Sequence, residues 1–566
     1  MRNALTEATE EMAATLRRSA YSTNVKTRQD FSCAFFDSQL RPIAQAFTQP
    51  VHLGSFVELI PRAVAKFGAE RIEPGDMIVV NDPYTGGSHL NDVTVFAPVH
   101  HSGVLLGYVC SLAHHVDVGG GAPASIGPFR EIYQEGVIIP PVRLVRRGEI
   151  ADDVFRLVMA QVRSKRVTAG DFRAQIAANL AGARRLGALV DRYGLEELQR
   201  YIDALLAYTS RRTLTEIGKL PRGTFEAEGF LDFDGFTDKV VNLRVSVTVD
   251  DDGVLFDFTG CDTQRRAPVN STYAMTFSAC AYVLRALMDK DLPINDGFYS
   301  FVRINAPAGT VVNAVHPGAV VGGWETQVRV TDTLFRALSA AMPEAVPAGC
   351  KAMMAQAGFG VLDSESGEYH CNYEALAGGY GGRAMRDGPD AVQGHGQNTE
   401  NAPVEEIEAH FPVRITRHEL IEDSEGAGRQ RGGLGLRRDY HFPRDEATFT
   451  ILSDRDLAGP HGLFGGLAGR KARYLLDPDG EARPLTSKSI TELIPGATVS
   501  FQTPGGGGYG PPEERDPGLV ARDVEDGKIS PERALDVYRV AMDAAMRGAD
   551  ASATARLRDA DRPRSE

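Results

Sequence analysis

Apolar residues recur at helical spacing in several stretches of the chain. In residues 3–20 an apolar side chain falls at every third or fourth position, which predicts an amphipathic helix. The positions that set this period are Leu5, Ala8, Met12 and Leu16. Residues 151–218, rich in Ala, Leu and Arg, predict a long helical region. Shorter helices are predicted over 273–289 and 330–342, and a helix of mixed character over 530–558.

Other apolar segments have the length and composition of β-strands. Residues 28–37 and 76–82 each predict a buried strand, and the second runs into a Pro-Tyr-Thr-Gly-Gly turn. Residues 92–99 and 104–113 predict a strand pair joined by a turn at His100–Gly103.

The later part of the chain alternates between strand and helix blocks. Residues 118–136 are rich in Gly and Pro and predict a loop, whereas 223–260 return to strands. Residues 350–510 are strand-rich and unusually rich in glycine. This alternation predicts a mixed α/β (α+β), multi-layer fold of several intimately packed subdomains rather than a single named topology.

Composition narrows the classes of function. At roughly 100–200 residues per domain, 566 residues suggest about three to five folding units. The net charge of -14 argues against a nucleic-acid binder and against a protein that binds anionic membranes. We find neither an apolar run of about 20 residues nor an apolar segment behind the N-terminus. We therefore expect no membrane segment and no secretion signal.

Cysteine usage points to the cytoplasm. No two cysteines form a C-x-x-C pair, and several have apolar neighbours, which favours buried thiols in a reducing compartment over a structural zinc cluster. The six cysteines are Cys33, Cys110, Cys261, Cys280, Cys350 and Cys371.

Metal-capable side chains are densest between residues 30 and 117. His89 and Asp92 lie three positions apart in Gly86-Gly87-Ser88-His89-Leu90-Asn91-Asp92, so one turn of backbone could aim both at one ion. His114, His115 and Asp117 follow some twenty residues on. Imidazole and carboxylate ligands suit Zn, Mn, Fe or Co. Alternatively, these side chains cap turns in a glycine-rich loop, and the residues alone leave both interpretations open.

These candidates fall in the first of five expected regions. The regions are 1–150, metal-binding α/β; 151–220, helical; 221–345, α/β; 346–512, glycine-rich and strand-dominated; and 513–566, a C-terminal helix and tail. The end of that tail, Asp561–Glu566, is expected to fray.

Long motifs give the chain a specific resemblance. Arg28-Gln29-Asp30-Phe31-Ser32-Cys33-Ala34, Asn81-Asp82-Pro83-Tyr84 with Gly86-Gly87-x-His89-x-x-Asp92, and His114-His115-x-Asp117-Val118-Gly119-Gly120 resemble signatures of the hydantoinase B/oxoprolinase family. Further similar segments are Asp423–Gly433 and Thr503–Gly510, so the resemblance covers nearly the whole chain. The family includes N-methylhydantoinase, 5-oxoprolinase, caprolactamase and the acetone carboxylase α subunit.

The resemblance implies a set of metal ligands. Carried over residue by residue, they are Asp30, His89, Asp92 and His114. His114 and His115 are neighbours, so in an extended segment they would point to opposite faces, and either could be the ligand. We expect the other histidine, His115, together with Asp117, to act in catalysis, with Asp117 able to orient a ligand imidazole.

A central segment departs from the family pattern. The family commonly reads G-G-N-V-E-T-S-Q-R where this chain has Gly322-Gly323-Trp324-Glu325-Thr326-Gln327-Val328-Arg329. We expect Trp324, Glu325 and Arg329 to bind substrate, with a surface ion pair as the alternative for Glu325 and Arg329. Relatives also usually carry a short segment before the first helix, which a start codon placed too late would explain.

The resemblance also implies the reaction. No G-x-x-x-x-G-K-[ST] phosphate loop is present, and the glycine-rich segments read as tight turns. We therefore expect ATP to bind a hydantoinase A-like, actin/hexokinase-like partner subunit, in a hetero-oligomer such as α2β2. The partner would phosphorylate a cyclic amide, and this subunit would hydrolyse it with one divalent transition metal.

Two other interpretations stay open at this point. The first is the α subunit of an acetone carboxylase-like, ATP-dependent ligase, which a third small subunit and bicarbonate dependence would reveal. The second is a scaffold subunit without metal. An intact set of His89, Asp92 and His114 argues against a scaffold.

Overall fold

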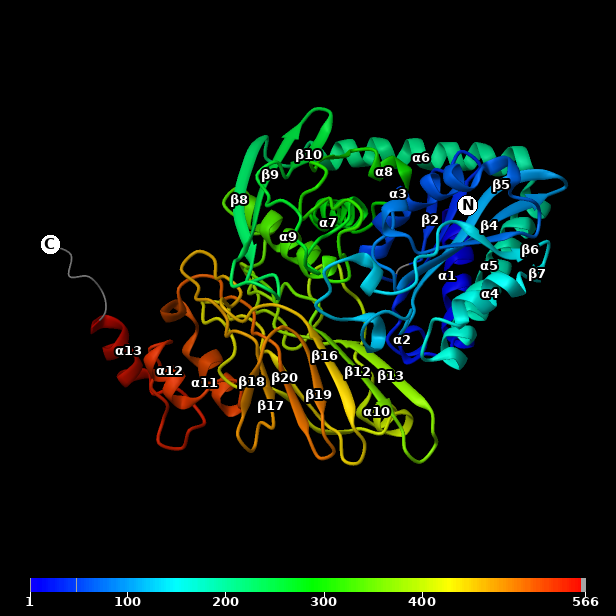
Figure 1. Ribbon diagram of the computed structural model, residues 1–566. Coiled ribbons are helices and arrows are strands. Elements are labelled where there is room, and N and C mark those ends of the chain that lie inside the picture. The colour runs from blue at the N-terminus through cyan, green and yellow to red at the C-terminus, as the bar shows by residue number, and fades with distance from the viewer. Residues whose placement is uncertain (1, 47, 561–566) are drawn as a thin grey trace.

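The computed structural model describes residues 2–46 and 48–560. It confirms a mixed α+β fold in which four sheets pack with helices in several layers (Figure 1). Within the described residues, no helix has both the length and the apolar character needed to cross a membrane. The predicted fraying tail, 561–566, lies outside the described residues.

An antiparallel sheet of seven strands forms the N-terminal region, in the order β2-β1-β5-β4-β3-β6-β7. Its strands are β1 (Phe31–Asp37), β2 (Pro42–Gln45), β3 (Met77–Val80), β4 (Asp92–His101), β5 (Val104–His114), β6 (Val142–Arg146) and β7 (Glu149–Ile150). The predicted strands and the β4–β5 pairing are confirmed. The register sets Asp92 of β4 directly opposite His114 of β5.

Helices cover both faces of this sheet, so β1 and β3 are buried along their whole length, whereas the edge strand β7 is exposed. Alternate residues of β1 enter different cores: Cys33 and Phe35 pack with α1 (Arg2–Ser19) and α5 (Lys165–Tyr193), and Ala34 and Phe36 pack on the opposite face. That opposite face is covered by α3 (Pro50–Phe67). The remaining helices of this half are α2 (Thr23–Lys26), α4 (Asp152–Met159) and α6 (Leu195–Ile217).

A second sheet, in the order β11-β10-β9-β8, packs against α7 and α9. Its elements are β8 (Gly223–Leu231), β9 (Val241–Asp250), β10 (Gly253–Asp257), α7 (Tyr273–Ala286), α8 (Asp296–Tyr299), β11 (Val302–Asn305) and α9 (Gly323–Leu338). The helix predicted over 330–342 corresponds to α9. Its predicted start is wrong, because α9 begins at Gly323. Charged residues recur at helical spacing from Glu325 to Arg336, so the sequence carries a helical period that extends the helix before residue 330.

The glycine-rich region holds two sheets that share one core, as in a β-sandwich. The first sheet contains β13 (Tyr369–Ala375), β12 (Gln356–Leu362), β16 (Ala447–Leu452) and β19 (Lys488–Leu493). The second contains β14 (Arg414–Leu420), β15 (Leu436–His441), β20 (Thr498–Gln502), β17 (Arg473–Leu476) and β18 (Arg483–Leu485), and α10 (Val404–His410) packs nearby. Phe359 and Phe449 of the first sheet contact the rings of Tyr440 and Phe442 from the second.

Glycines let three loops of this region approach one another closely. A Cβ on Gly379 would lie 2.1 Å from the nitrogen of Gly506 and 2.2 Å from the carbonyl oxygen of Gly433. Real Cβ atoms do not come this close to backbone, so these positions require glycine. The loops therefore pack against each other, which agrees with the prediction of tight turns.

The predicted helix over 530–558 is wrong. Two short helices, α12 (Pro531–Asp536) and α13 (Ala551–Ala560), flank a non-helical segment, and α11 (Pro517–Glu525) precedes them. Within that segment Arg539 and Met546 have positive φ angles, which interrupt a right-handed helix. Figure 1 shows the three helices grouped beside the β17–β18 end of the sandwich.

Candidate metal centre

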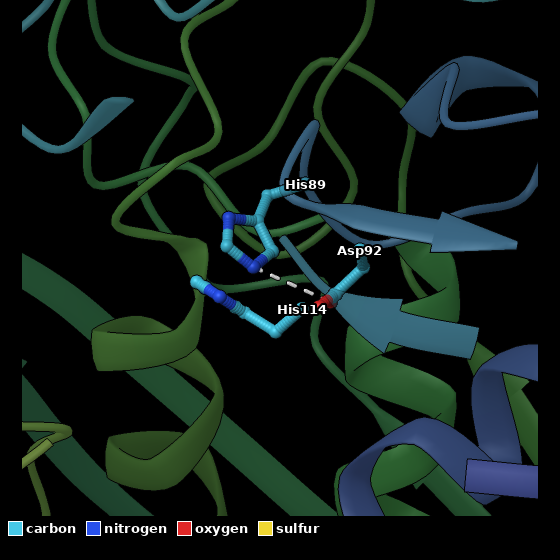
Figure 2. A group of neighbouring side chains, drawn as sticks. All are labelled: His89, Asp92 and His114. Carbon is cyan, nitrogen blue, oxygen red and sulfur yellow. Dashed lines mark ion pairs between the residues drawn. The ribbon is translucent and has the colours of Figure 1, made fainter. Parts of the chain in front are cut away.

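Two paired strands and the turn before them bring three metal-capable side chains together. Asp92 begins β4, His114 ends β5, and His89 lies on the preceding turn, where its carbonyl accepts the N–H of Asp92 at 3.1 Å. One ligand atom from each side chain lies within 4.8 Å of the other two. Figure 2 shows the three side chains pointing toward one another. All three are buried.

The polar atoms of this cluster suit a bound cation. Both ring nitrogens of His89, Oδ1 of Asp92 and Nε2 of His114 have no hydrogen-bond partner among the described residues. Buried polar atoms are rarely left unpaired, and imidazole nitrogen with carboxylate oxygen is the donor set of borderline divalent metals. His89, Asp92 and His114 therefore fit a divalent transition metal.

Electrostatics keep these side chains ready to act as ligands. Burial opposes the charge on Asp92, but the His89 and His52 imidazoles hold the pKa of Asp92 below its usual range. Burial, with His89 nearby, lowers the pKa of His114 well below its usual value. Asp92 is therefore anionic and His114 neutral, which are the forms that bind metal.

Two contacts fix the His114 ring. It stacks on Tyr373 with ring centroids 4.5 Å apart, and its Nδ1 lies 3.2 Å from the amide of Asn24 on α2. The Arg28 guanidinium donates to Oδ1 of Asn24 at 3.1 Å. These contacts leave Nε2 of His114 directed into the cluster.

Asp30 lies at the edge of the cluster, next to His52, a histidine that belongs to none of the sequence motifs. Nε2 of His52, on α3, lies 3.8 Å from Oδ1 of Asp30 and 3.7 Å from Oδ1 of Asp92. Burial raises the pKa of Asp30, and the neighbouring His52 opposes this. Only the helical register of α3, which turns this position toward the sheet, could have indicated His52.

His115 and Asp117 make their contacts elsewhere. Nε2 of His115 lies 3.0 Å from Oε1 of Gln175 on α5, and its ring packs on Phe172, so the two neighbouring histidines face opposite ways. Asp117 accepts two hydrogen bonds from Arg163, at 2.6 Å from the backbone N–H and 2.9 Å from the guanidinium. Their catalytic role stays a prediction.

Of the three predicted substrate-binding residues, Trp324 lies nearest the cluster. Its ring centroid is 6.0 Å from those of His52 and His89. Glu325 is buried, which raises its pKa to about 7, and its Oε2 accepts the Met354 N–H at 2.9 Å. Arg329 forms an ion pair with Asp454 at 2.6 Å, so the protein itself engages this guanidinium.

Comparison with known proteins decides the family. The family model described as hydantoinase B/oxoprolinase matches residues 1–512. The chain belongs to this family. A Pseudomonas protein named as a D-/L-hydantoinase subunit is 32% identical, over 94% of this chain and 92% of that protein.

Two solved structures share the fold. An ATP-dependent caprolactamase from Pseudomonas jessenii superposes with a TM-score of 0.90 at 28% identity, over 99% of this chain and 98% of the other. An acetone carboxylase superposes with a TM-score of 0.91 over 99% of this chain and 81% of the other, but at 20% identity this likeness shows the fold alone.

Proposed function

We propose that this chain is the metal-dependent hydrolase subunit of an ATP-dependent amidohydrolase. Its substrate would be a cyclic amide, such as a hydantoin, 5-oxoproline or a lactam, activated by phosphorylation on a partner subunit. The observation that carries this proposal is the buried cluster of ligand atoms on His89, Asp92 and His114, in which Nε2 of His89 lies 3.3 Å from Oδ2 of Asp92. The hydantoinase and caprolactamase names of its relatives support the class of reaction.

The metal would be held by His89, Asp92 and His114, with Asp30 beside them. When bound, the ion would act as a Lewis acid toward water and the substrate carbonyl. His52 would accept a proton at Nε2, where the carboxylates of Asp30 and Asp92, 3.8 and 3.7 Å away, stabilise the imidazolium. Trp324 would exclude water from one side of the centre.

We propose positioning roles for His115 and Asp117. His115 ties the end of β5 to Gln175, which itself donates to the carbonyl oxygens of Val93 and Ser111. Asp117 ties the following loop to Arg163. Both contacts would hold His114 in its place on β5.

A cavity at α2 would admit the substrate, although none of its lining residues belongs to the His89 cluster. It has a volume of about 700 Å³, and its lining includes Thr23 of α2, the neighbour of the His114 partner Asn24. Its basic lining residues outnumber its acidic ones, which suits an anionic, phosphorylated ligand. The charged lining residues are Lys26, Arg163, Lys165, Arg166, Glu368 and Glu406.

ATP would act through the partner. The glycine-rich loops around Gly379, Gly433 and Gly506 are packed against backbone, so they offer no cradle for phosphate. We propose a hydantoinase A-like, actin/hexokinase-like subunit as the partner, in a cytoplasmic hetero-oligomer such as α2β2. The word subunit in the name of the hydantoinase relative supports a partner of some kind.

The test is co-expression with the neighbouring ATP-binding subunit and a screen of cyclic amides. Ring opening is followed by mass spectrometry and ATP hydrolysis by released phosphate. His89→Ala should abolish ring opening and remove one metal ion per chain. His101→Ala, at the outer end of β4, is the matched control and should keep both. Full ring opening by His89→Ala would refute the proposal.

The same assay decides the alternatives. Only a fold likeness favours the ligase interpretation, and it requires ATP hydrolysis that depends on a ketone and bicarbonate. A scaffold subunit would contain no metal at the His89 cluster, which elemental analysis of the purified complex would show.

A further inference from the structure

A second buried cluster of metal-capable side chains lies on α9, away from the His89 cluster. It combines Asp332, Cys350 and His395, whose ligand atoms lie within 4.8 Å of one another. Asp332 follows Trp324 on α9 by two helical turns, about 12 Å along the axis. The three side chains come from three separate segments, so no short motif in the sequence indicates this site.

The ring of His395 is oriented as a ligand. Its Nδ1 lies 3.2 Å from the hydroxyl of Tyr380, and its Nε2 lies 3.7 Å from Oδ1 of Asp332. Nε2 makes no hydrogen bond within the described part of the chain, although His395 is 0% exposed. Ligand histidines commonly use one ring nitrogen for a partner that fixes the ring and leave the other for the metal.

The sulfur of Cys350 accepts one backbone hydrogen bond, and its own backbone binds Asp332. The backbone N–H of Ala352 donates to Sγ at 3.3 Å, and the Cys350 N–H donates to Oδ1 of Asp332 at 3.1 Å. These contacts hold the sulfur beside Asp332, and cysteine sulfur is a ligand that Zn²⁺ prefers.

His461 and Arg455 both lie at the other carboxylate oxygen of Asp332. Nδ1 of His461 lies 3.5 Å from Oδ2 of Asp332, and the Arg455 guanidinium lies 3.3 Å from the same oxygen. Arg455 engages Oδ2, so Oδ1 remains on the side of Cys350 and His395.

We propose that Asp332, Cys350 and His395 bind a second divalent ion. Sulfur, imidazole and carboxylate together are a ligand set that suits Zn²⁺. The ion would join α9 to the glycine-rich loops, because His461 and Gly349 are already tied by a 2.8 Å backbone hydrogen bond. This inference does not depend on the proposed hydrolase activity.

Metal analysis of the purified full chain tests the site. Cys350→Ser should lower the zinc content by one ion per chain, and Cys280→Ser, a buried thiol on α7, should not. His89→Ala should remove a different ion, so the two proposals fail separately. Equal zinc content in Cys350→Ser and wild type would overturn the second site.

Cobalt substitution provides a test that needs no folded cysteine variant. After chelation and reloading with Co²⁺, the wild type should show a thiolate-to-cobalt charge-transfer band in the near ultraviolet. His89→Ala should keep the band, because the first cluster contains only nitrogen and oxygen ligands. Zn²⁺ should also protect Cys350 from alkylation, located by peptide mass spectrometry. No band and no protection in the wild type would refute the site.

Discussion

Glu135 links the pH dependence of stability to the segment that leads into α9. Its Oε1 accepts the N–H groups of Val320 and Val321 at 2.7 and 2.8 Å, and the side chain is 1% exposed. Burial raises its pKa from 4.5 to about 8, against the lowering effect of these two hydrogen bonds. We predict that Glu135→Gln stabilises the protein at alkaline pH.

The sign and size follow from linkage. Between about pH 4.5 and 8 the unfolded chain releases the Glu135 proton while the folded chain keeps it, so this group lowers stability as pH rises. The full effect is at most about 5 kcal/mol and is complete above pH 8. Glutamine keeps the acceptor for both N–H groups and does not ionise, so the variant loses this pH dependence.

Thermal unfolding from pH 5 to 9 measures the effect. Glu135→Gln should match the wild type near pH 5 and melt several degrees higher near pH 9. Glu149→Gln, at the exposed strand β7, is the control and should follow the wild type throughout. A difference between Glu135→Gln and wild type that does not grow with pH would refute the reasoning.

Three further predictions concern buried contacts and metal. Arg438→Met should lower the unfolding free energy by about 3–5 kcal/mol, because it leaves the buried Glu374 carboxylate, 3.2 Å away, without its ion-pair partner. The double variant with Glu374→Leu should recover part of this loss in denaturant melts. Gly379→Ala should yield insoluble protein, whereas Gly187→Ala, in α5, where a Cβ would make an ordinary contact 3.8 Å from Nδ1 of His101, should gain about 0.5–1 kcal/mol in the same melts. Removing metal with a chelator should lower the melting temperature, and ions added back at a hundredfold excess over Kd should restore about 2.7 kcal/mol.

Much of the fold could be predicted because the signals are local. The amphipathic period of α1 and the apolar runs of β1, β4 and β5 follow from which faces they bury. The start of α9 was predicted too late, although its charged residues from Glu325 to Arg336 keep helical spacing. The C-terminal helix was overpredicted because left-handed residues such as Arg539 carry no compositional mark.

Candidate ligands could be predicted only where they share a short segment or a known motif. His89 and Asp92 share one turn, and strand pairing adds His114. His52 reaches the cluster only because α3 packs on the sheet, and nothing in its neighbours marks it. Cys350 and His395 could not be predicted for the same reason, because only tertiary packing brings them next to Asp332 of α9.

The arrangement along α9 makes the two centres separable by spectroscopy. Trp324 is the one tryptophan of the chain, and its ring lies 6.0 Å from that of His89. Asp332 sits two turns further on, about 12 Å along the helix. Tryptophan emission therefore reports ion binding at the first centre, and the cobalt–thiolate band reports the second. An ion titration that changed the emission in Cys350→Ser but not in His89→Ala would assign the first binding event to the His89 cluster.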